Sequence, residues 1–326
     1  MTISRLVVVA AMLGLTACPP PASPRDQRGG GGAGTAINPD ACGSINTSAV
    51  GKKLYAFLVA SAELDHASAE LEATVLGACH RMAVDLGTSP EGDTKTVCTR
   101  VAQELQANLQ VSVKTEKRLV TRYSPPVCHT ELDFAANVAA QCEASASADV
   151  DVRCQGTCNG ACNGTCSATN AAGQCAGTCS GDCNGSCDGY ADVQASADCK
   201  ASANVRANLH TECSEPKVEV VQQDVTIVDD SKFQKAMAAI NHGMPTLLRA
   251  SKKLELAGKA VVAWVQTGAS LVASTGELVG ELGEKGVCVG GQLAAVVAAS
   301  ANIQARFSVS IEVSAQVSAS AGATAQ

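Results

Sequence analysis

The residues best suited to chemistry in this chain are the cysteines between positions 154 and 187. The segment reads CQGTCNGACNGTCSATNAAGQCAGTCSGDCNGSC, in which two runs of four cysteines follow a Cys-x-Gly-x pattern on either side of an eight-residue linker. Closely spaced thiolates bind soft metal ions, reactive thiols exchange with disulfides, and oxidised cysteine pairs cross-link a chain. The arrangement of the cysteines must therefore decide among a metal cluster, a redox device and a structural cross-link.

The two cysteine runs are mirror images of each other about the linker. The residue numbers add up to 341 in each of the pairs Cys154 with Cys187, Cys158 with Cys183, Cys162 with Cys179, and Cys166 with Cys175. The outer pairs Cys142 with Cys199 and Cys128 with Cys213 have the same sum. An antiparallel hairpin in a fixed register produces such a constant sum. We therefore predict disulfides straight across a hairpin, with glycine facing glycine between the bridges.

The N-terminus has the features of an export signal. Residues 1–17 contain one early cation, Arg5, and an apolar stretch at residues 6–15, which is too short to be a transmembrane span. The sequence LTAC at residues 15–18 resembles the lipobox of bacterial lipoproteins, and the resemblance covers these residues alone. It implies that Cys18 becomes the acylated first residue of the mature chain and anchors it in a membrane. An ordinary cleaved signal peptide is the alternative.

The residues after Cys18 predict a lipid-anchored protein of the cell envelope. Residue 19 is Pro and not Asp, which by analogy with the sorting rule of Gram-negative lipoproteins favours the outer membrane. Residues 18–41 are rich in Pro and Gly, a composition typical of a flexible tether. We therefore divide the chain into a signal peptide at 1–17, the lipidated tether at 18–41, and one domain at 42–326. That domain contains the cysteine-rich hairpin finger at about 154–187.

The number of cysteines favours disulfides over other thiol chemistry. The chain has 17 cysteines, so removing Cys18 leaves an even number in an exported protein. Of the four outside the mirror, Cys79 and Cys98 are the local pair, which leaves Cys42 for Cys288. Disulfides of another connectivity and a soft-metal thiolate cluster stay open as alternatives. A redox catalyst is disfavoured, because nothing resembles a Cys-x-x-Cys pair before a helix.

Alternating apolar and polar residues predict strands around the finger. The alternation extends the hairpin to two long strands at roughly 128–166 and 175–213, and it recurs at 104–122 and 303–317. A short fifth strand is expected within 217–230. These strands form a long twisted antiparallel sheet of about four strands, polar on one face and rich in Ala and Val on the other.

Two segments with helical periodicity are expected to cover the apolar face of that sheet. The periodicity appears at about 47–86 and 231–299, where Asp229, Asp230 and Ser231 are candidate N-caps and residues 242–245 are expected to break the second helix. The predicted fold class is therefore α+β, with helices on one face of the sheet and the disulfide-laddered hairpin projecting beyond it.

Other polar residues give no catalytic motif. His129 and His210 are expected near each other at the hairpin base, beside Glu131 and Glu212, where solvated polar residues are a better interpretation than a metal site. No serine or cysteine nucleophile has a recognisable partner by motif, and the net charge of −7 excludes a basic nucleic-acid footprint. We expect no catalytic residues, no metal and no cofactor.

The sequence therefore favours a non-enzymatic lipoprotein with a structural or partner-binding role. Its expected partners are a membrane, through the anchor at Cys18, and an unknown protein or envelope component that contacts the hairpin. A soft-metal or thiol redox module using the Cys-x-Gly-x runs is the second hypothesis, and an enzyme of unrecognised class is the third.

Overall fold

The structure is a computed structural model, and its described residues fall in unit 34–326 of a chain that divides into two units. It describes residues 36–112, 120–129, 132–143, 152–169, 175, 177–187, 190–193, 196–221, 227–273 and 282–325. The predicted signal peptide, Cys18 and most of the predicted tether lie outside these residues.

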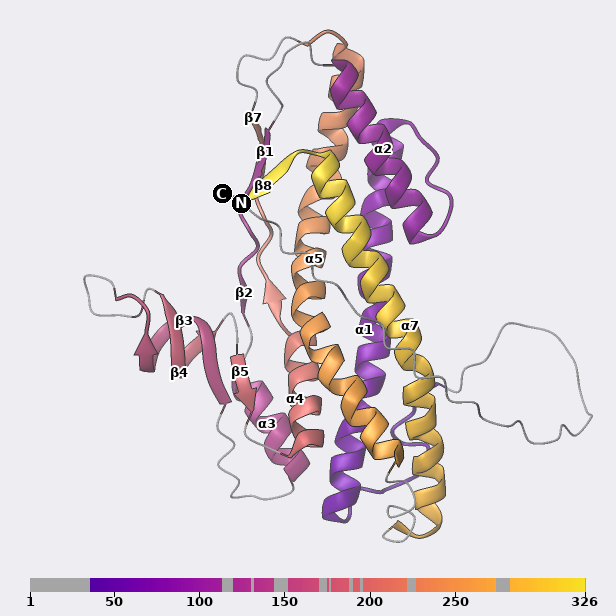
Figure 1. The fold of residues 1–326 in the computed structure, drawn as a ribbon, viewed down its shortest axis with the longest axis vertical. Coiled ribbons are helices and arrows are strands. Elements are labelled where there is room, and N and C mark those ends of the chain that lie inside the picture. Colours follow the sequence, from indigo (N-terminus) through magenta and orange to yellow (C-terminus); the bar gives the residue numbers. More distant parts are fainter. Residues whose placement is uncertain are drawn as a thin grey trace, which may run out of the picture. The chain divides into compact units, whose positions relative to one another are not determined.

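Four long helices form the main body of the described unit. They are α1 (Ala49–Leu86), α2 (Thr94–Ser112), α5 (Asp230–Ala273) and α7 (Glu284–Ser320), and each contacts the other three (Figure 1). Two shorter helices, α3 (Leu132–Glu143) and α4 (Ala197–Leu209), pack against each other, and both contact α1. The apolar core lies between these helices.

The centre of the core contains the only tryptophan of the chain. Trp264 of α5 is fully buried, and its Nε1 donates a hydrogen bond to Ser61 Oγ of α1 at 2.8 Å. Ser61 in turn donates to the carbonyl oxygen of Phe57 at 2.7 Å, and the Phe57 ring lies 6.4 Å from that of Trp264. This arrangement satisfies the polar atoms of the buried indole, as a buried tryptophan requires.

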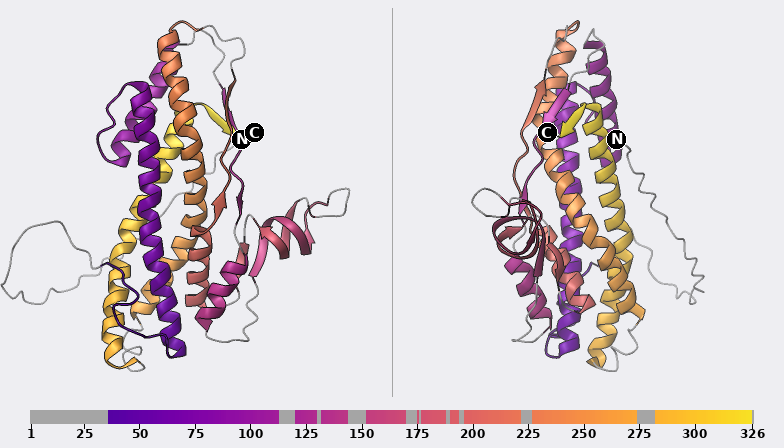
Figure 2. Two further views of the ribbon diagram at one scale, coloured as in Figure 1. Left: turned by 180° about the vertical axis from the view of Figure 1, so that it is seen from behind. Right: turned by 60° about the vertical axis from the view of Figure 1, so that its left-hand side comes forward.

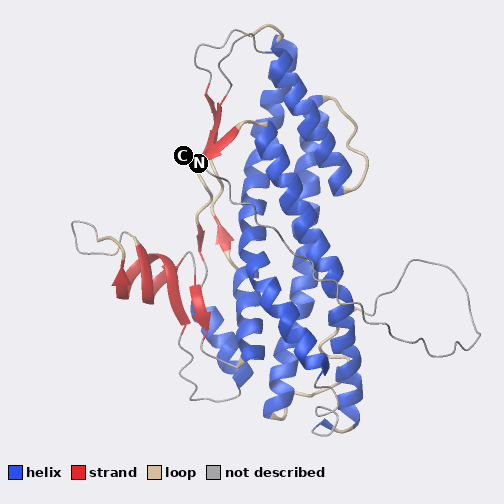
Figure 3. Cartoon of the chain, in the orientation of Figure 1, coloured by secondary structure: helices blue, strands red, loops and turns tan. Residues whose placement is uncertain are grey.

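The strands of the described residues form three small sheets, in which two strands of the third sheet are long and the others have four residues or fewer (Figure 3). In the first, β1 (Val120–Tyr123) pairs antiparallel with β7 (Val218–Val221) and parallel with β8 (Ala323–Ala325). In the second, β2 (Cys128–His129) pairs with β6 (Glu212–Cys213). In the third, β3 (Val152–Cys166) pairs with β4 (Thr178–Cys187) and β5 (Tyr190–Val193). The fifth strand expected within 217–230 is present as β7.

The predicted α+β fold, a long antiparallel sheet covered by helices, is wrong. Residues 303–317 lie in α7, and residues 104–112 of the predicted strand at 104–122 lie in α2. The residues of α7 that are buried are Gly286, Val289, Leu293, Ala295, Val296, Ile303, Phe307, Ser310, Val313, Ser314 and Val317. These positions mostly recur every three or four residues, whereas Ile311, apolar in the alternating pattern, is 40% exposed. Alanine favours helices strongly, and the structure follows that propensity.

The predicted long strands of the hairpin are also interrupted by helices. Residues 132–143 form α3 and residues 197–209 form α4, so strand structure is limited to the short β2 and β6 pair and the cysteine-rich segments. In α3 the buried Ala135, Val138, Ala139 and Cys142 follow the helical period. An antiparallel helix pair keeps a constant sum of residue numbers just as a strand pair does, so the mirror did not distinguish the two.

The two helical regions were predicted more accurately. The expected helix at 47–86 is α1, in which Ser48 Oγ accepts from Gly51 N at 3.0 Å and Gly87 ends the helix with a φ of 76°. Asp229 caps α5 by accepting from Lys232 N at 3.1 Å. The expected break at residues 242–245 is absent, because α5 continues through Pro245. The buried neighbours Met244 and Leu247 hold both sides of the proline in the core.

Two of these helices, α5 and α7, are long and apolar enough to cross a membrane by length and composition. Their most apolar windows are 38% and 33% buried inside the protein. Both helices supply core residues to the bundle, a position that also requires an apolar face.

Candidate functional site

The cysteine-rich strands β3 and β4 pair antiparallel and wind into a ring-shaped ladder, called the coil below. One stretch of the β3–β4 ladder places Cys158 opposite Cys187, Cys162 opposite Cys183 and Cys166 opposite Cys179. A second stretch places Cys154 opposite Gly181. Residues 179–181 therefore have a β3 partner on each side, and the two strands wind into the ring seen end-on in Figure 2. This winding covers the edge that a flat hairpin would leave open.

Two disulfides cross-link the coil between the partners predicted from the sequence. Cys162 is bonded to Cys179 with a Cα–Cα distance of 5.9 Å, and Cys166 is bonded to Cys175 at 5.7 Å. Both distances are in the usual range for disulfides. The cross-links therefore lie at the end of the coil that is closest to the linker.

The backbone register of the coil differs from the predicted one by four residues. Opposed residues have numbers that add up to 345 between Cys158 and Cys166, so the bonded cysteines are not direct ladder partners. Glycine still faces glycine in this stretch, as in the pair Gly160 and Gly185, whereas Gly156 is opposite Cys179 in the other stretch, where the numbers add up to 335. The prediction that the bridges run straight across the strands is wrong here. A Cys-x-Gly-x repeat looks the same after a shift of four, and Gly-rich strands specify register weakly.

Four more disulfides join the remaining predicted partners among the described residues. They are Cys128–Cys213 in the β2–β6 pair, Cys142–Cys199 between α3 and α4, Cys79–Cys98 between α1 and α2, and Cys42–Cys288 at the start of α7. The side chains of Cys154, Cys158, Cys183 and Cys187 lie outside what the structure describes. Their two bridges stay predictions.

Glu143 fixes the base of the arm formed by α3, α4 and the coil. Its carboxylate accepts a hydrogen bond from the backbone N–H of Ser196, just before α4, at 2.5 Å, and it pairs with Lys53 of α1 at 3.1 Å. The hydrogen bond from Ser196 is the main reason that the pKa of Glu143 is lowered, with Lys53 a smaller cause. The charged form of Glu143 therefore ties α3 to α4 and to α1.

Arg206 of α4 provides a second attachment to the bundle. Its Nε lies 2.9 Å from Glu63 Oε2 of α1, and its guanidinium lies over the Phe134 ring at 5.4 Å. The ring of His210 contacts Phe134 at a centroid distance of 4.6 Å. His210 is thus part of this packing between α3 and α4.

The histidines at the hairpin base do not form a metal centre with the described residues. His129 is opposite Glu212 in the β2–β6 pair, whereas His210 contacts Phe134, and Glu131 lies outside the described residues. Within the described ranges, no group of three or more His, Cys, Asp or Glu side chains could hold a metal ion. The arrangement there supports packing and cross-linking.

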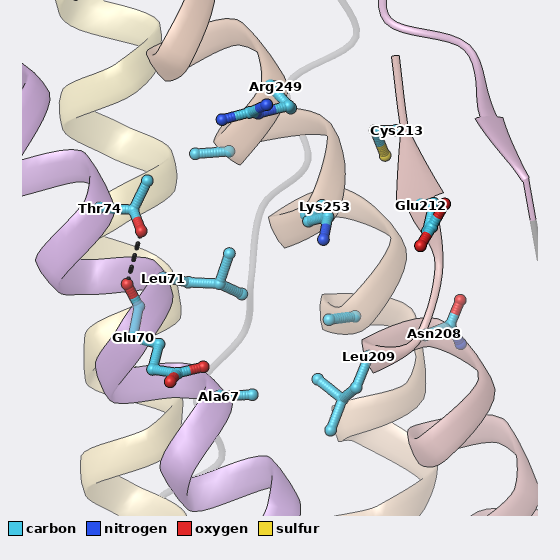
Figure 4. A pocket seen from close by; sticks show the side chains of 12 residues that line it. Ala67, Glu70, Leu71, Thr74, Asn208, Leu209, Glu212, Cys213, Arg249 and Lys253 are labelled. Carbon is cyan, nitrogen blue, oxygen red and sulfur yellow. Dashed lines mark hydrogen bonds between the residues drawn. The ribbon is translucent and has the colours of Figure 1, made fainter. Parts of the chain in front are cut away.

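A groove of about 390 Å³ lies beside the base of the arm (Figure 4). Its lining residues come from α1, α4, β6 and α5, and they are Ala67, Glu70, Leu71, Thr74, Asn208, Leu209, Glu212, Cys213, Arg249, Ala250, Lys253 and Ala257. Arg249 and Lys253 were not predicted from the sequence as site residues. Their spacing of one helical turn was a usable signal, but their position facing α4 and β6 required the fold.

A second cavity of about 340 Å³ lies between α1 and α3, beside Cys142. The hydroxyl of Tyr55, on its wall, donates a hydrogen bond to Asp40 at 3.0 Å. That bond and burial both raise the pKa of Tyr55. The shift moves the pKa of Tyr55 further from neutral pH, which does not favour a role in acid–base catalysis.

Comparison with known proteins found no matching family model, no matching curated protein and no matching solved structure.

Proposed function

We propose that the protein is a non-enzymatic, lipid-anchored component of the cell envelope that presents its disulfide-stapled coil to a partner. The observation that carries this proposal is the coil itself, which is cross-linked by Cys162–Cys179 and Cys166–Cys175. Figure 1 shows β3 and β4 projecting away from the helices, with α3 and β5 at their base. A rigid element that adds little to the apolar core is better explained by contact with a partner than by folding.

The rigidity of the coil favours binding because less conformational freedom is lost when it meets a partner. Cross-linked loops bind with a smaller entropic cost than flexible ones. Ser167, Ala168 and Thr169, the first residues of the linker, are exposed. Small residues such as Ser and Thr supply hydrogen bonds and little apolar area. The linker end of the coil therefore fits a polar envelope component better than an apolar protein surface.

The experiment compares binding of the mature protein and a coil-deleted variant to purified envelope fractions. In the variant, residues 155–186 are replaced by a short Gly-Ser linker, while α3, α4 and the Cys142–Cys199 bridge are kept. Unchanged far-UV circular dichroism and Trp264 fluorescence would establish that the bundle still folds. We expect the mature protein to bind one fraction and the variant to lose that binding. Equal binding by both proteins would contradict a role for the coil.

The proposed anchor is tested separately in cells. Cys18→Ser should abolish incorporation of labelled palmitate and move the protein from the membrane fraction to the soluble fraction, because the acyl chains supply the membrane affinity. Pro19→Asp should keep the label and shift the protein from the outer to the inner membrane. Palmitate labelling that persists in Cys18→Ser would refute the lipobox interpretation.

A further inference from the structure

We propose that the groove between α1, α4 and α5 binds a small amphiphile that carries one anionic group on a short apolar body. The proposal goes beyond the role of the coil and depends on different residues. The apolar lining of the groove, here called its floor, includes Leu71 of α1, Leu209 of α4 and Ala250 of α5. Figure 4 shows the side chains of Leu71 and Leu209. The groove volume of about 390 Å³ falls within the range of small-molecule sites.

Two cations supply the charge that recognises an anion. Arg249 and Lys253 lie one turn apart on α5, line the groove, and are half-buried. Among the described residues neither has an ion-pair partner, whereas the adjacent Lys252 pairs with Glu255 at 3.1 Å. A partly desolvated cation without a partner is unfavourable, so an anion between the two side chains would gain a charge-assisted contact.

The two carboxylates that line the groove are exposed. The side chain of Glu70 is 68% exposed and lies 3.5 Å from His66, which does not line the groove, and Glu212 is exposed on β6. Figure 4 shows Lys253 between the α1 wall and the Glu212 wall. Exposed carboxylates are screened by water and interact weakly, whereas half-buried cations keep more of their field. The groove therefore favours an anionic head over a cationic one.

The apolar floor distinguishes this ligand from a free inorganic anion. Leu71 and Leu209 are partly buried and pack against the core, which leaves some of their surface facing the groove. A short alkyl chain on these two side chains would bury apolar surface, and each buried methylene adds to the affinity. Inorganic phosphate, which has no apolar part, should bind much more weakly than an alkyl carboxylate or an alkyl phosphate.

The test is isothermal titration of the intact mature protein with octanoate and with octyl phosphate. We expect both to bind, and inorganic phosphate and octyltrimethylammonium to bind at least tenfold more weakly. The double substitution Arg249→Gln with Lys253→Gln should weaken octanoate binding tenfold or more. Lys252→Gln, which removes a cation that already has a partner, is the matched control and should leave binding unchanged.

A second arm distinguishes a free amphiphile from a lipid headgroup. Vesicles of phosphatidylcholine with and without phosphatidylglycerol are used with protein that lacks the acylated Cys18. Binding to the anionic vesicles that needs Arg249 and Lys253 would identify the source as a lipid headgroup, and octanoate binding without vesicle binding would identify a free amphiphile. Absence of binding to all the anionic probes, or equal binding by the double variant, would overturn the proposal. The coil-deleted variant should bind octanoate normally, so the two proposals fail independently.

Discussion

Single residues decide how closely the helices of this core approach one another. Gly243 of α5 packs against α1, where a Cβ placed on it would lie 2.1 Å from Cγ of the buried Met82. Real Cβ atoms do not reach such a distance, so a larger side chain must displace Met82 or separate the helices. The small residues of this alanine-rich chain are therefore structural requirements at contact positions and optional elsewhere.

Gly243→Ala should destabilise the protein, whereas Gly258→Ala should not. Overpacking at the contact with Met82 is expected to lower the free energy of unfolding by about 1–3 kcal/mol. Gly258, on the same helix, has open space around its Cβ position, so alanine there should be neutral or stabilising by up to about 1 kcal/mol. Urea unfolding followed by Trp264 fluorescence measures both variants. Similar effects of the two substitutions would show that the close approach of α1 and α5 is incorrect.

Ser61→Ala should destabilise the core by leaving the Trp264 Nε1 proton without its acceptor. An unpaired buried donor costs about 1–3 kcal/mol, which sets the expected loss in the free energy of unfolding. Ser300→Ala is the control, because Ser300 Oγ donates to its own helix at Val297 O on the partly exposed side of α7. A loss at Ser61 no larger than that at Ser300 would mean that the indole is not bonded to Ser61.

The lowered pKa of Glu143 makes its contribution to stability depend on pH. A group whose pKa is lower in the folded state stabilises that state above its unfolded pKa, and this stabilisation is lost as the pH falls through the folded pKa. Glu143→Gln should therefore reduce the unfolding free energy at pH 7. It should make much less difference at acidic pH below the lowered pKa of Glu143, which itself lies below the ordinary value of about 4.3 for glutamate. Urea unfolding of both proteins at several pH values measures this. An effect of equal size at neutral and strongly acidic pH would exclude the ion pair with Lys53 and the bond from Ser196.

At the scale of elements, the sequence predicted which segments lie side by side more accurately than it predicted the secondary structure of those segments. The constant sum of 341 holds in the structure for Cys128–Cys213, where strands pair, and for Cys142–Cys199, where helices pair. It also holds for the β1–β7 pair, in which Val120 is opposite Val221. Both segments change from strand to helix at matching positions, so the sum of 341 is kept from the β1–β7 pair to the Cys142–Cys199 bridge. Beyond the helices the sum changes, because Val152 is opposite Val193 in the β3–β5 pair.

The helices α3 and α4 and residues 303–317 of α7 were predicted as strands because the alternating pattern outweighed the high helix propensity of alanine. Alanine occupies two of the six alternate apolar positions in α3 and four of the seven in α4, and alanine fits a helix better than a strand. The register of the coil was unpredictable for a different reason, since a four-residue repeat matches itself at several offsets. The spacing of Arg249 and Lys253 could be read from the sequence, but the groove could not, because the residues beside them come from α1, α4 and β6.

Removing different disulfides should affect stability according to the loops that they close. Cys42–Cys288 spans 246 residues, so replacing both cysteines by alanine should cost about 5 kcal/mol of unfolding free energy. The Cys142–Cys199 bridge spans 57 residues inside the loop already closed by Cys128–Cys213 and closes a much smaller extra ring, so its loss should cost less, about 3 kcal/mol. Urea unfolding of the two double variants measures the order. The reverse order would contradict the nested arrangement of the bridges.

At the scale of the described unit, the protein is a helical bundle that supports a cross-linked arm. The bundle is stabilised by its buried apolar residues, and α1 and α5 also hold the arm through α4. The coil is stabilised mainly by covalent bridges and its own backbone pairing. This division predicts that reduction should disorder the coil before the bundle melts, because the bundle keeps its core when the bridges of the coil open.

The most direct test of this account is non-reducing digestion of the mature domain, with its bridges mapped by mass spectrometry and its thiols and bound metal counted on the same sample. The account predicts no free thiols, no stoichiometric metal, and links that join Cys162 to Cys179 and Cys166 to Cys175. The same digest should link Cys154 to Cys187 and Cys158 to Cys183. Links between neighbouring cysteines of one run, or bound metal with about eight free thiols, would contradict the stapled coil.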